Sequence, residues 1–175
     1  MQRPTWATVV GVLGILFGVF GVLNAIQSVA LPFFFELQER VFDTVKDQAY
    51  NDPGAPVALI EMIDDMFDLS GWQKLWFMLT GFIALIINGF YLYAAIILLQ
   101  VRQSAIRTIY IVLWVSIMFA LIQGLVGLSM STLLGFGIMI GSLFSIALDA
   151  ILLIVVSSAD KSAFRKPPQP LTATT

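Results

Sequence analysis

The sequence predicts an all-α membrane protein, a four-transmembrane-helix bundle with an extracytoplasmic amphipathic helical hairpin between helices 1 and 2. Two observations predict this class. Apolar residues make up 59% of the 175 residues and charged residues only 11%, whereas a soluble domain carries about 25% charged residues. In addition, four stretches reach the roughly 20 mostly apolar residues that a helix needs to cross a bilayer. We therefore expect a single transmembrane domain over residues 1–158.

The four expected spans differ in how they are joined. They cover residues 6–31, 72–99, 106–130 and 133–156. Only a few residues separate the second, third and fourth spans, so these neighbours are expected to form antiparallel hairpins. The first span is followed instead by the long segment 33–71.

An alternative interpretation makes the first span a cleaved signal peptide. Ser28, Val29 and Ala30 form a small-residue site of the kind that signal peptidase cleaves. However, the apolar run 7–23 is longer than the core of a usual signal peptide, and the chain stays apolar after Ala30. We therefore expect the first span to be retained.

The segment 33–71 is expected to form the outer hairpin. Its apolar residues recur at helical spacing among charges, in the two groups Phe34, Leu37, Val41, Phe42, Val45 and Leu59, Ile60, Ile63, Met66, Phe67. Turn-forming residues at 51–56 separate the groups. We expect two amphipathic helices that face the bundle or the lipid interface, and Ser70 as the cap of the second span. The polar, proline-bearing tail 159–175 is expected to be a disordered cytoplasmic end.

The distribution of charge predicts the orientation. One set of span ends carries six basic residues, Arg3, Arg102, Arg107, Lys161, Arg165 and Lys166. The other set carries the acidic segment, in which only Arg40 and Lys46 oppose nine acidic residues. Because cytoplasmic loops are enriched in Lys and Arg, we expect a multi-pass protein of the inner cell membrane with both termini in the cytoplasm.

Composition excludes several classes of chemistry. The chain has no cysteine and no histidine, so thiol redox enzymes and zinc-dependent membrane proteases are excluded. No motif predicts a catalytic residue, a metal site or a cofactor, and no basic cluster predicts nucleic-acid binding. Asp64, Asp65 and Asp68 lie in a helical pattern and not in a calcium-binding loop, so we interpret them as a solvated charged face.

Small residues recur on one face of each span. In the first span Gly11, Gly14, Gly18 and Gly21 lie within an arc of about 80°. In the fourth span Gly137 and Gly141 form a small-xxx-small pair. Because helices in lipid associate through close contact of small residues, these glycines are expected to pack helices together, although such faces can also line a polar cavity.

Asp149 is the most informative single residue, because it lies well inside the fourth span. An ionised carboxylate at the membrane centre costs about 2.5–3.5 kcal/mol, so this group must be protonated, paired or hydrated. One interpretation makes it a proton or cation site. The other makes it a structural anchor that bonds to Tyr91, Asn88, Arg102 or Arg107.

Further polar side chains are expected at other depths of the membrane. Asn24, Gln27 and Gln123 gather toward the outer end, and Asn88 lies between them and Asp149. They form either a relay or a set of ordinary interhelical hydrogen bonds. We therefore treat Asp149, Asn88, Tyr91 and Gln123 as a candidate intramembrane polar site.

Two parts of the chain resemble small uncharacterised bacterial four-span membrane proteins. They are Arg3, Pro4 and Thr5 before the glycine-rich first span, and the run 94–99 followed by Arg102 and 105–107. The resemblance implies a four-span fold and no activity. Small multidrug transporters also have four spans, but the glutamate of their first span and their short loops are missing here.

The sequence leaves the function open between classes. We expect a non-enzymatic membrane scaffold, accessory subunit or regulator, with a homo-oligomer or another membrane protein as partner within the lipid bilayer. The alternative is a small ion-coupled transporter or channel that uses Asp149. A weaker alternative is a membrane enzyme that uses the outer carboxylates.

Overall fold

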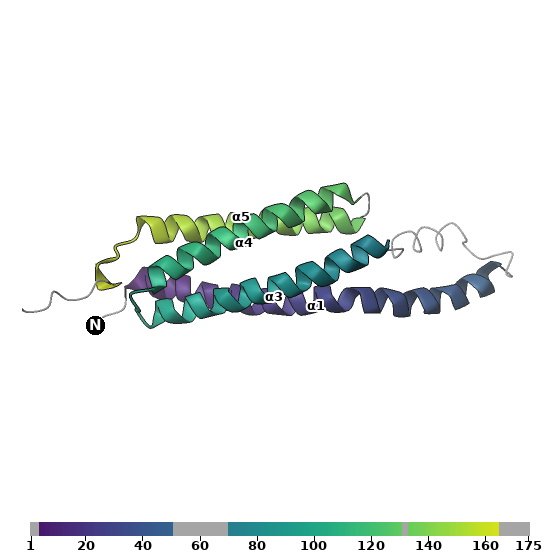
Figure 1. The fold of residues 1–175 in the computed structure, drawn as a ribbon, viewed down its shortest axis with the longest axis horizontal. Coiled ribbons are helices and arrows are strands. Elements are labelled where there is room, and N and C mark those ends of the chain that lie inside the picture. The colour runs from purple at the N-terminus through teal and green to yellow at the C-terminus, as the bar shows by residue number, and fades with distance from the viewer. Residues whose placement is uncertain (1–3, 51–69, 131–132, 165–175) are drawn as a thin grey trace, which may run out of the picture.

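The computed structural model describes residues 4–50, 70–130 and 133–164, and this part of the chain is all-helical. Its elements are α1 (Thr5–Tyr50), α3 (Gly71–Leu99), α4 (Ala105–Ser129), α5 (Leu133–Ser158) and the 3-10 turn η1 (Ser162–Phe164), shown in Figure 1. Each of the four α-helices contains a stretch long and apolar enough to span a membrane. The fold is therefore that of a multi-pass membrane helical bundle.

The expected second, third and fourth spans are confirmed as helices, with bounds that differ by at most two residues from α3, α4 and α5. The predicted cap is confirmed as well, because Ser70 is the N-cap of α3. The Gln73 side-chain oxygen accepts a 2.9 Å hydrogen bond from the backbone N–H of Ser70. This bond satisfies a donor that precedes the first turn of the helix.

The end of the first helix differs from the expectation. α1 does not stop near residue 31 but continues through Pro32 to Tyr50 as one helix. Proline removes one helical hydrogen bond, yet helices in lipid tolerate this loss when neighbouring groups satisfy the freed carbonyl. The first expected outer helix is thus a continuation of α1. The turn and the second outer helix fall at 51–69, outside the described residues, so the hairpin stays a prediction.

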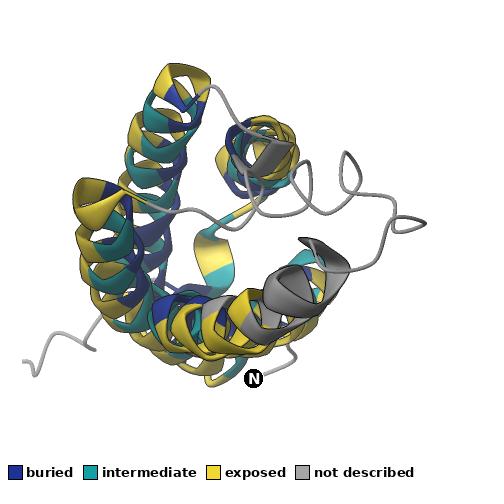
Figure 2. Ribbon diagram, turned by 90° about the vertical axis from the view of Figure 1, so that its right-hand side faces the viewer, coloured by how far each residue is buried: buried dark blue, intermediate teal, exposed yellow. Residues whose placement is uncertain are grey.

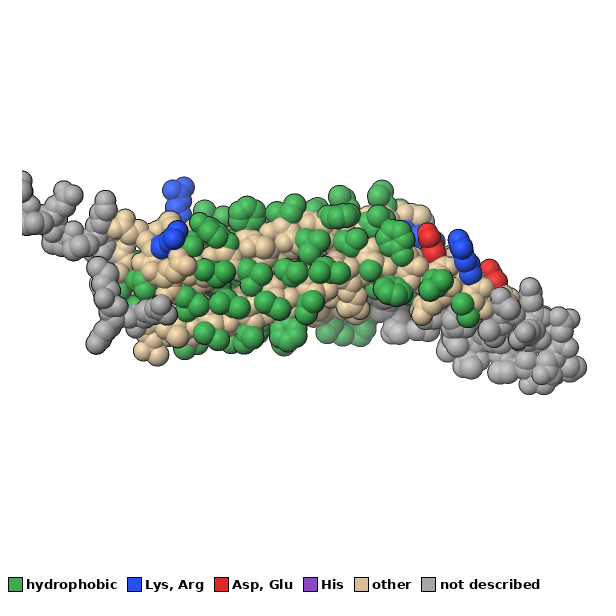
Figure 3. Space-filling model, turned by 90° about the horizontal axis from the view of Figure 1, so that it is seen from below, with side chains coloured by type: hydrophobic (Ala, Val, Ile, Leu, Met, Phe, Trp, Pro, Cys, Tyr) green, Lys and Arg blue, Asp and Glu red, His purple; other side chains and the backbone are tan. Residues whose placement is uncertain are grey.

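The surface of the bundle is apolar along its length. Large side chains on all four helices are exposed, for example Phe20, Leu79, Leu125 and Ile154. Figure 3 shows that apolar side chains cover the middle of the visible face and that charged ones lie toward its two ends. A surface of this kind needs lipid around it, because a soluble protein rarely exposes large continuous apolar patches.

The helices form two closely packed antiparallel pairs, α1 with α3 and α4 with α5. Contacts between the pairs are fewer, and the contact of α1 with α5 is the smallest of those between neighbouring helices. In Figure 2 the helices surround a central region, toward which their buried faces turn. The two pairs are therefore the units between which an internal site can form.

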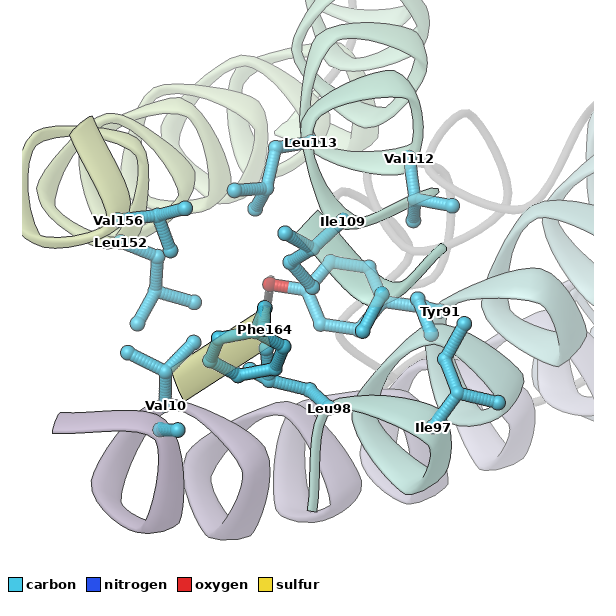
Figure 4. Close-up of a cluster of buried hydrophobic side chains, with 13 residues drawn as sticks. Val10, Tyr91, Ile97, Leu98, Ile109, Val112, Leu113, Leu152, Val156 and Phe164 are labelled. Atoms are coloured by element: carbon cyan, nitrogen blue, oxygen red, sulfur yellow. The ribbon is translucent and has the colours of Figure 1, made fainter. Parts of the chain in front are cut away.

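An apolar core joins the two pairs at the end of the bundle where α1 begins, which we call the terminal end. Its largest fully buried side chains are Val10, Ile97, Leu98, Ile109, Leu113 and Val156, most of which are seen together in Figure 4. A smaller cluster of Phe35 and Phe77 with Leu31 and Ile138 lies toward the opposite end, which we call the far end.

Residues after α5 contribute to the terminal core. Phe164 of η1 is buried in it, and its ring lies 5.6 Å from that of Trp6. The indole N–H of Trp6 also donates a 3.0 Å hydrogen bond to the carbonyl oxygen of Asp160. The expectation of a disordered tail from residue 159 is therefore wrong for 159–164, while 165–175 lie outside the described residues.

Candidate functional site

A cavity of about 960 Å³ lies between the two helical pairs, with walls from all four helices. Its polar lining residues are Asn24, Ser28, Thr80, Asn88, Tyr91, Ser116, Gln123, Ser142, Ser145 and Asp149. The rest of the lining is small or apolar, with several aromatic rings. The volume lies in the upper part of the roughly 300–1,000 Å³ typical of pockets for small molecules.

Asp149 marks the boundary between this cavity and the terminal core. On α5, Ser142 and Ser145 precede it on the cavity wall, while Leu152 and Val156 follow it on the same helical face in the apolar core. On α3, Tyr91 lines the cavity and also belongs to the core. The helical repeat of α5 therefore places one carboxyl group where the apolar packing stops.

The two oxygens of the Asp149 carboxyl group have different surroundings. The Tyr91 hydroxyl donates a 2.9 Å hydrogen bond to Oδ1, and the Ser116 side chain lies against the group. Oδ2 is buried and makes no hydrogen bond of good geometry with the described residues. The whole side chain is only 4% exposed. An unsatisfied buried acceptor costs about 1–3 kcal/mol, and more when it is charged, so this oxygen requires an explanation.

All four residues of the candidate polar site line this one cavity. Tyr91, one of the expected anchors, is the residue that bonds to Asp149. The Asn88 amide instead donates a 2.8 Å hydrogen bond to the carbonyl of Ala84 one turn earlier. Arg102 and Arg107 are exposed and do not line the cavity.

The glycines of α1 lie against α3. A Cβ atom added to Gly14 would come 3.0 Å from that of Ala95, and one added to Gly18 would come 2.7 Å from a terminal carbon of Leu92. Atoms added to Gly11 and Gly21 would come closer still to Leu99 and Asn88. The glycine face is thus filled by a helix of the same chain, and a second copy would need another surface.

Gly137 and Gly141 have a different environment from the one expected. No described side chain approaches within 4 Å of the position that a Cβ atom would occupy on either residue. Both line the cavity, so the absence of side chains there widens it and does not bring two helices together.

Several wall residues were not identified from the sequence. Phe17 and Phe119 are ordinary apolar residues in the sequence, and nothing in their spacing separates a cavity wall from a lipid-facing surface. Thr80 bonds to its own helix through a 2.7 Å hydrogen bond to the carbonyl of Trp76. On α4, the one sequence pattern that indicated wall residues was the helical spacing of Ser116 and Gln123.

The cavity has a simple charge distribution. Among the described residues, Asp149 is the single acid that lines it, and no arginine or lysine does so. The described residues contain no group of three or more acidic side chains that would hold a metal ion. Comparison of the chain with protein-family models, with curated proteins and with solved structures finds no match, so the site itself is the basis for a functional assignment.

Proposed function

We propose that the protein is a small carrier that binds a solute in the cavity between its two helical pairs, with Asp149 as the anchoring residue. The observation that supports this most strongly is the Asp149 carboxyl group, which lines a cavity large enough for a small molecule and whose buried oxygen Oδ2 has no hydrogen-bond partner among the described residues. Intramembrane acids in this setting commonly mark substrate or ion pathways.

The arrangement favours a carrier over a scaffold. A structural anchor is complete once Tyr91 and Ser116 meet the carboxyl group, and it needs no adjoining space. Here, however, Asp149 also lines a cavity with polar walls, and its Oδ2 has no hydrogen-bond partner among the described residues. The glycine face of α1, which could otherwise pack against a second copy, is also filled by α3. A scaffold or accessory subunit remains the competing function.

The two apolar clusters fit a carrier in one of its states. The larger core separates the cavity from the terminal end, while the smaller cluster around Phe35 and Phe77 lies toward the far end. With both termini cytoplasmic in the inner membrane, as the basic residues favour, the larger core would face the cytoplasm. The cavity would then be closer to the outside.

Cysteine labelling tests this proposal, because the natural chain has no cysteine. Gly141→Cys and Ser145→Cys place a thiol on the cavity wall, whereas Ile140→Cys and Leu143→Cys place one on exposed apolar surface outside the cavity at nearly the same depth. A membrane-impermeant thiol reagent is added to vesicles of either orientation, and the labelled fraction is measured by mass shift.

We expect the two cavity thiols to be labelled from the side that the far end faces, and the two lipid-facing thiols to remain unlabelled. Addition of the reagent to the terminal side should label neither pair. Equal protection of all four positions from both sides would overturn the carrier proposal and favour a scaffold with a dry interior.

A further inference from the structure

The chemistry of the cavity also defines the class of solute, given the proposed carrier function on which this inference rests. We infer that the ligand is an amphipathic organic monocation, whose protonated amino group binds Asp149 and whose apolar body lies among the aromatic side chains.

The sign of the charge follows from the lining residues. Asp149 is the one carboxylic acid that the described residues place on the cavity wall, and none of the described arginines and lysines joins it there. In a region of low dielectric constant an unpaired carboxylate strongly disfavours a second negative charge and favours a positive one. An anionic solute would find no opposing charge in the cavity.

Because the carboxylate of Asp149 accepts hydrogen bonds, its ligand should carry a hydrogen-bond donor. Tyr91 already donates to Oδ1, so Oδ2 is the acceptor that is left without a hydrogen-bond partner among the described residues. A protonated amine supplies both the charge and the N–H group, and charge-assisted bonds of this kind are about twice as strong as neutral ones. A bare Ca²⁺ ion fits poorly, because it takes about six to eight oxygen ligands and Asp149 is the one carboxylate that the described part of the chain contributes to the wall.

The remainder of the wall is suited to an apolar body. Besides Tyr91, seven aromatic side chains of the described residues contribute to it, Phe17, Phe20, Phe35, Trp76, Phe77, Phe119 and Phe144. Aromatic faces attract organic cations as well as apolar groups, and the attraction is stronger where water is excluded. The amides of Asn24, Asn88 and Gln123 lie on the wall as well and can bond to polar substituents.

Three matched probes test the inference on the full chain in lipid nanodiscs. They are naphthylethylamine, which is protonated at neutral pH, the neutral naphthylethanol, and the anionic naphthylacetate. Binding of each radiolabelled probe is measured by equilibrium dialysis, with empty nanodiscs subtracted. This comparison uses the unmodified protein, so it does not depend on the folding of any variant.

We expect the amine to bind at least tenfold more tightly than the alcohol, and the carboxylate to show no binding above that of empty nanodiscs. Asp149→Asn should reduce the affinity for the amine to that for the alcohol. Asp43→Asn removes an exposed acid on α1 far from the cavity and should leave all three affinities unchanged. Gly141→Leu projects a bulky side chain into the cavity and keeps Asp149, and it should abolish binding of every probe.

The outcomes separate this inference from the proposed function. Equal affinity for amine and alcohol, with both lost in Gly141→Leu, would overturn the cationic ligand and keep the carrier. Tighter binding of the carboxylate, or no binding of the amine while the cavity thiols are labelled, would overturn the ligand class as well. Failure of the thiol labelling itself is the result that removes the carrier proposal.

Discussion

The hydroxyl of Tyr91 on α3 donates a 2.9 Å hydrogen bond to Oδ1 of Asp149 on α5, and this bond joins the two helical pairs where the cavity meets the terminal core. Both side chains are buried, at 3% and 4% exposure. The bond therefore has a structural role whatever the cavity binds, and its two partners can be separated by mutation.

Tyr91→Phe should lower the free energy of unfolding by about 1–3 kcal/mol, because the buried carboxyl group loses its donor. Tyr93→Phe is the matched control, since Tyr93 lies on the same helix with 52% of its surface exposed, and its effect should stay within about 0.5 kcal/mol. Unfolding in mixed micelles by titration with a denaturing detergent measures both. Equal stability of the two variants would show that the bond contributes little.

A second prediction concerns Gly81, which lies at the contact between α1 and α3. A Cβ atom there would lie 3.0 Å from the backbone nitrogen of Val29 and 3.1 Å from the carbonyl oxygen of Ala25. These are backbone atoms and cannot move aside cheaply, so Gly81→Ala should destabilise the bundle by about 1–3 kcal/mol.

Gly89→Ala is the control for that substitution, because the same added atom on α3 meets no described side chain within 4 Å. It should be neutral or slightly stabilising, since alanine favours helix over glycine. The same detergent titration compares the two variants. A loss of stability in Gly89→Ala as large as in Gly81→Ala would contradict the packing described for this helix.

A third prediction concerns Phe164, in the part of the chain that follows α5. Phe164→Ala should lower the free energy of unfolding by about 3 kcal/mol, near the lower end of the range for a buried phenylalanine, because η1 lies at the end of the bundle. Phe136→Ala removes a ring that is 56% exposed and should change stability far less in lipid. Thermal unfolding in nanodiscs, followed by circular dichroism, gives the comparison, and unchanged stability of Phe164→Ala would mean that η1 does not pack there.

Topology provides a fourth prediction. Ser104→Cys, in the connection from α3 to α4, should react with an impermeant thiol reagent only from the cytoplasmic side, and Gly71→Cys, at the start of α3, only from the outside. Both positions are exposed, and the Lys and Arg bias gives this direction. The reverse pattern would show that the far end faces the cytoplasm.

Much of the fold could be predicted from the sequence, because apolar length alone decides which segments cross a membrane. The ends of α3, α4 and α5 follow from polar residues and turns at those positions. The continuation of α1 could not be predicted in this way. Pro32 and the charges that follow it are usual signs of a helix end, yet α1 continues through them as one helix.

The site was predicted only in part. Asp149 and Tyr91 attract attention because polar groups are costly in lipid, and the structure brings them together. The aromatic wall residues could not be identified, because a phenylalanine facing lipid and one facing a cavity have the same sequence pattern. The environment of Gly137 and Gly141 could not be predicted either, because small residues occur both at tight helix contacts and on cavity walls.

The unbroken course of α1 has a mechanical consequence. At a rise of about 1.5 Å per residue, the 18 residues after Pro32 (residues 33–50) form an arm about 27 Å long. As long as this arm stays rigid, a tilt of about 10° at Pro32 moves its tip by about 5 Å. Any reorientation of α1 against the second pair of helices is thereby magnified at Tyr50, in the middle of the acidic segment 33–71.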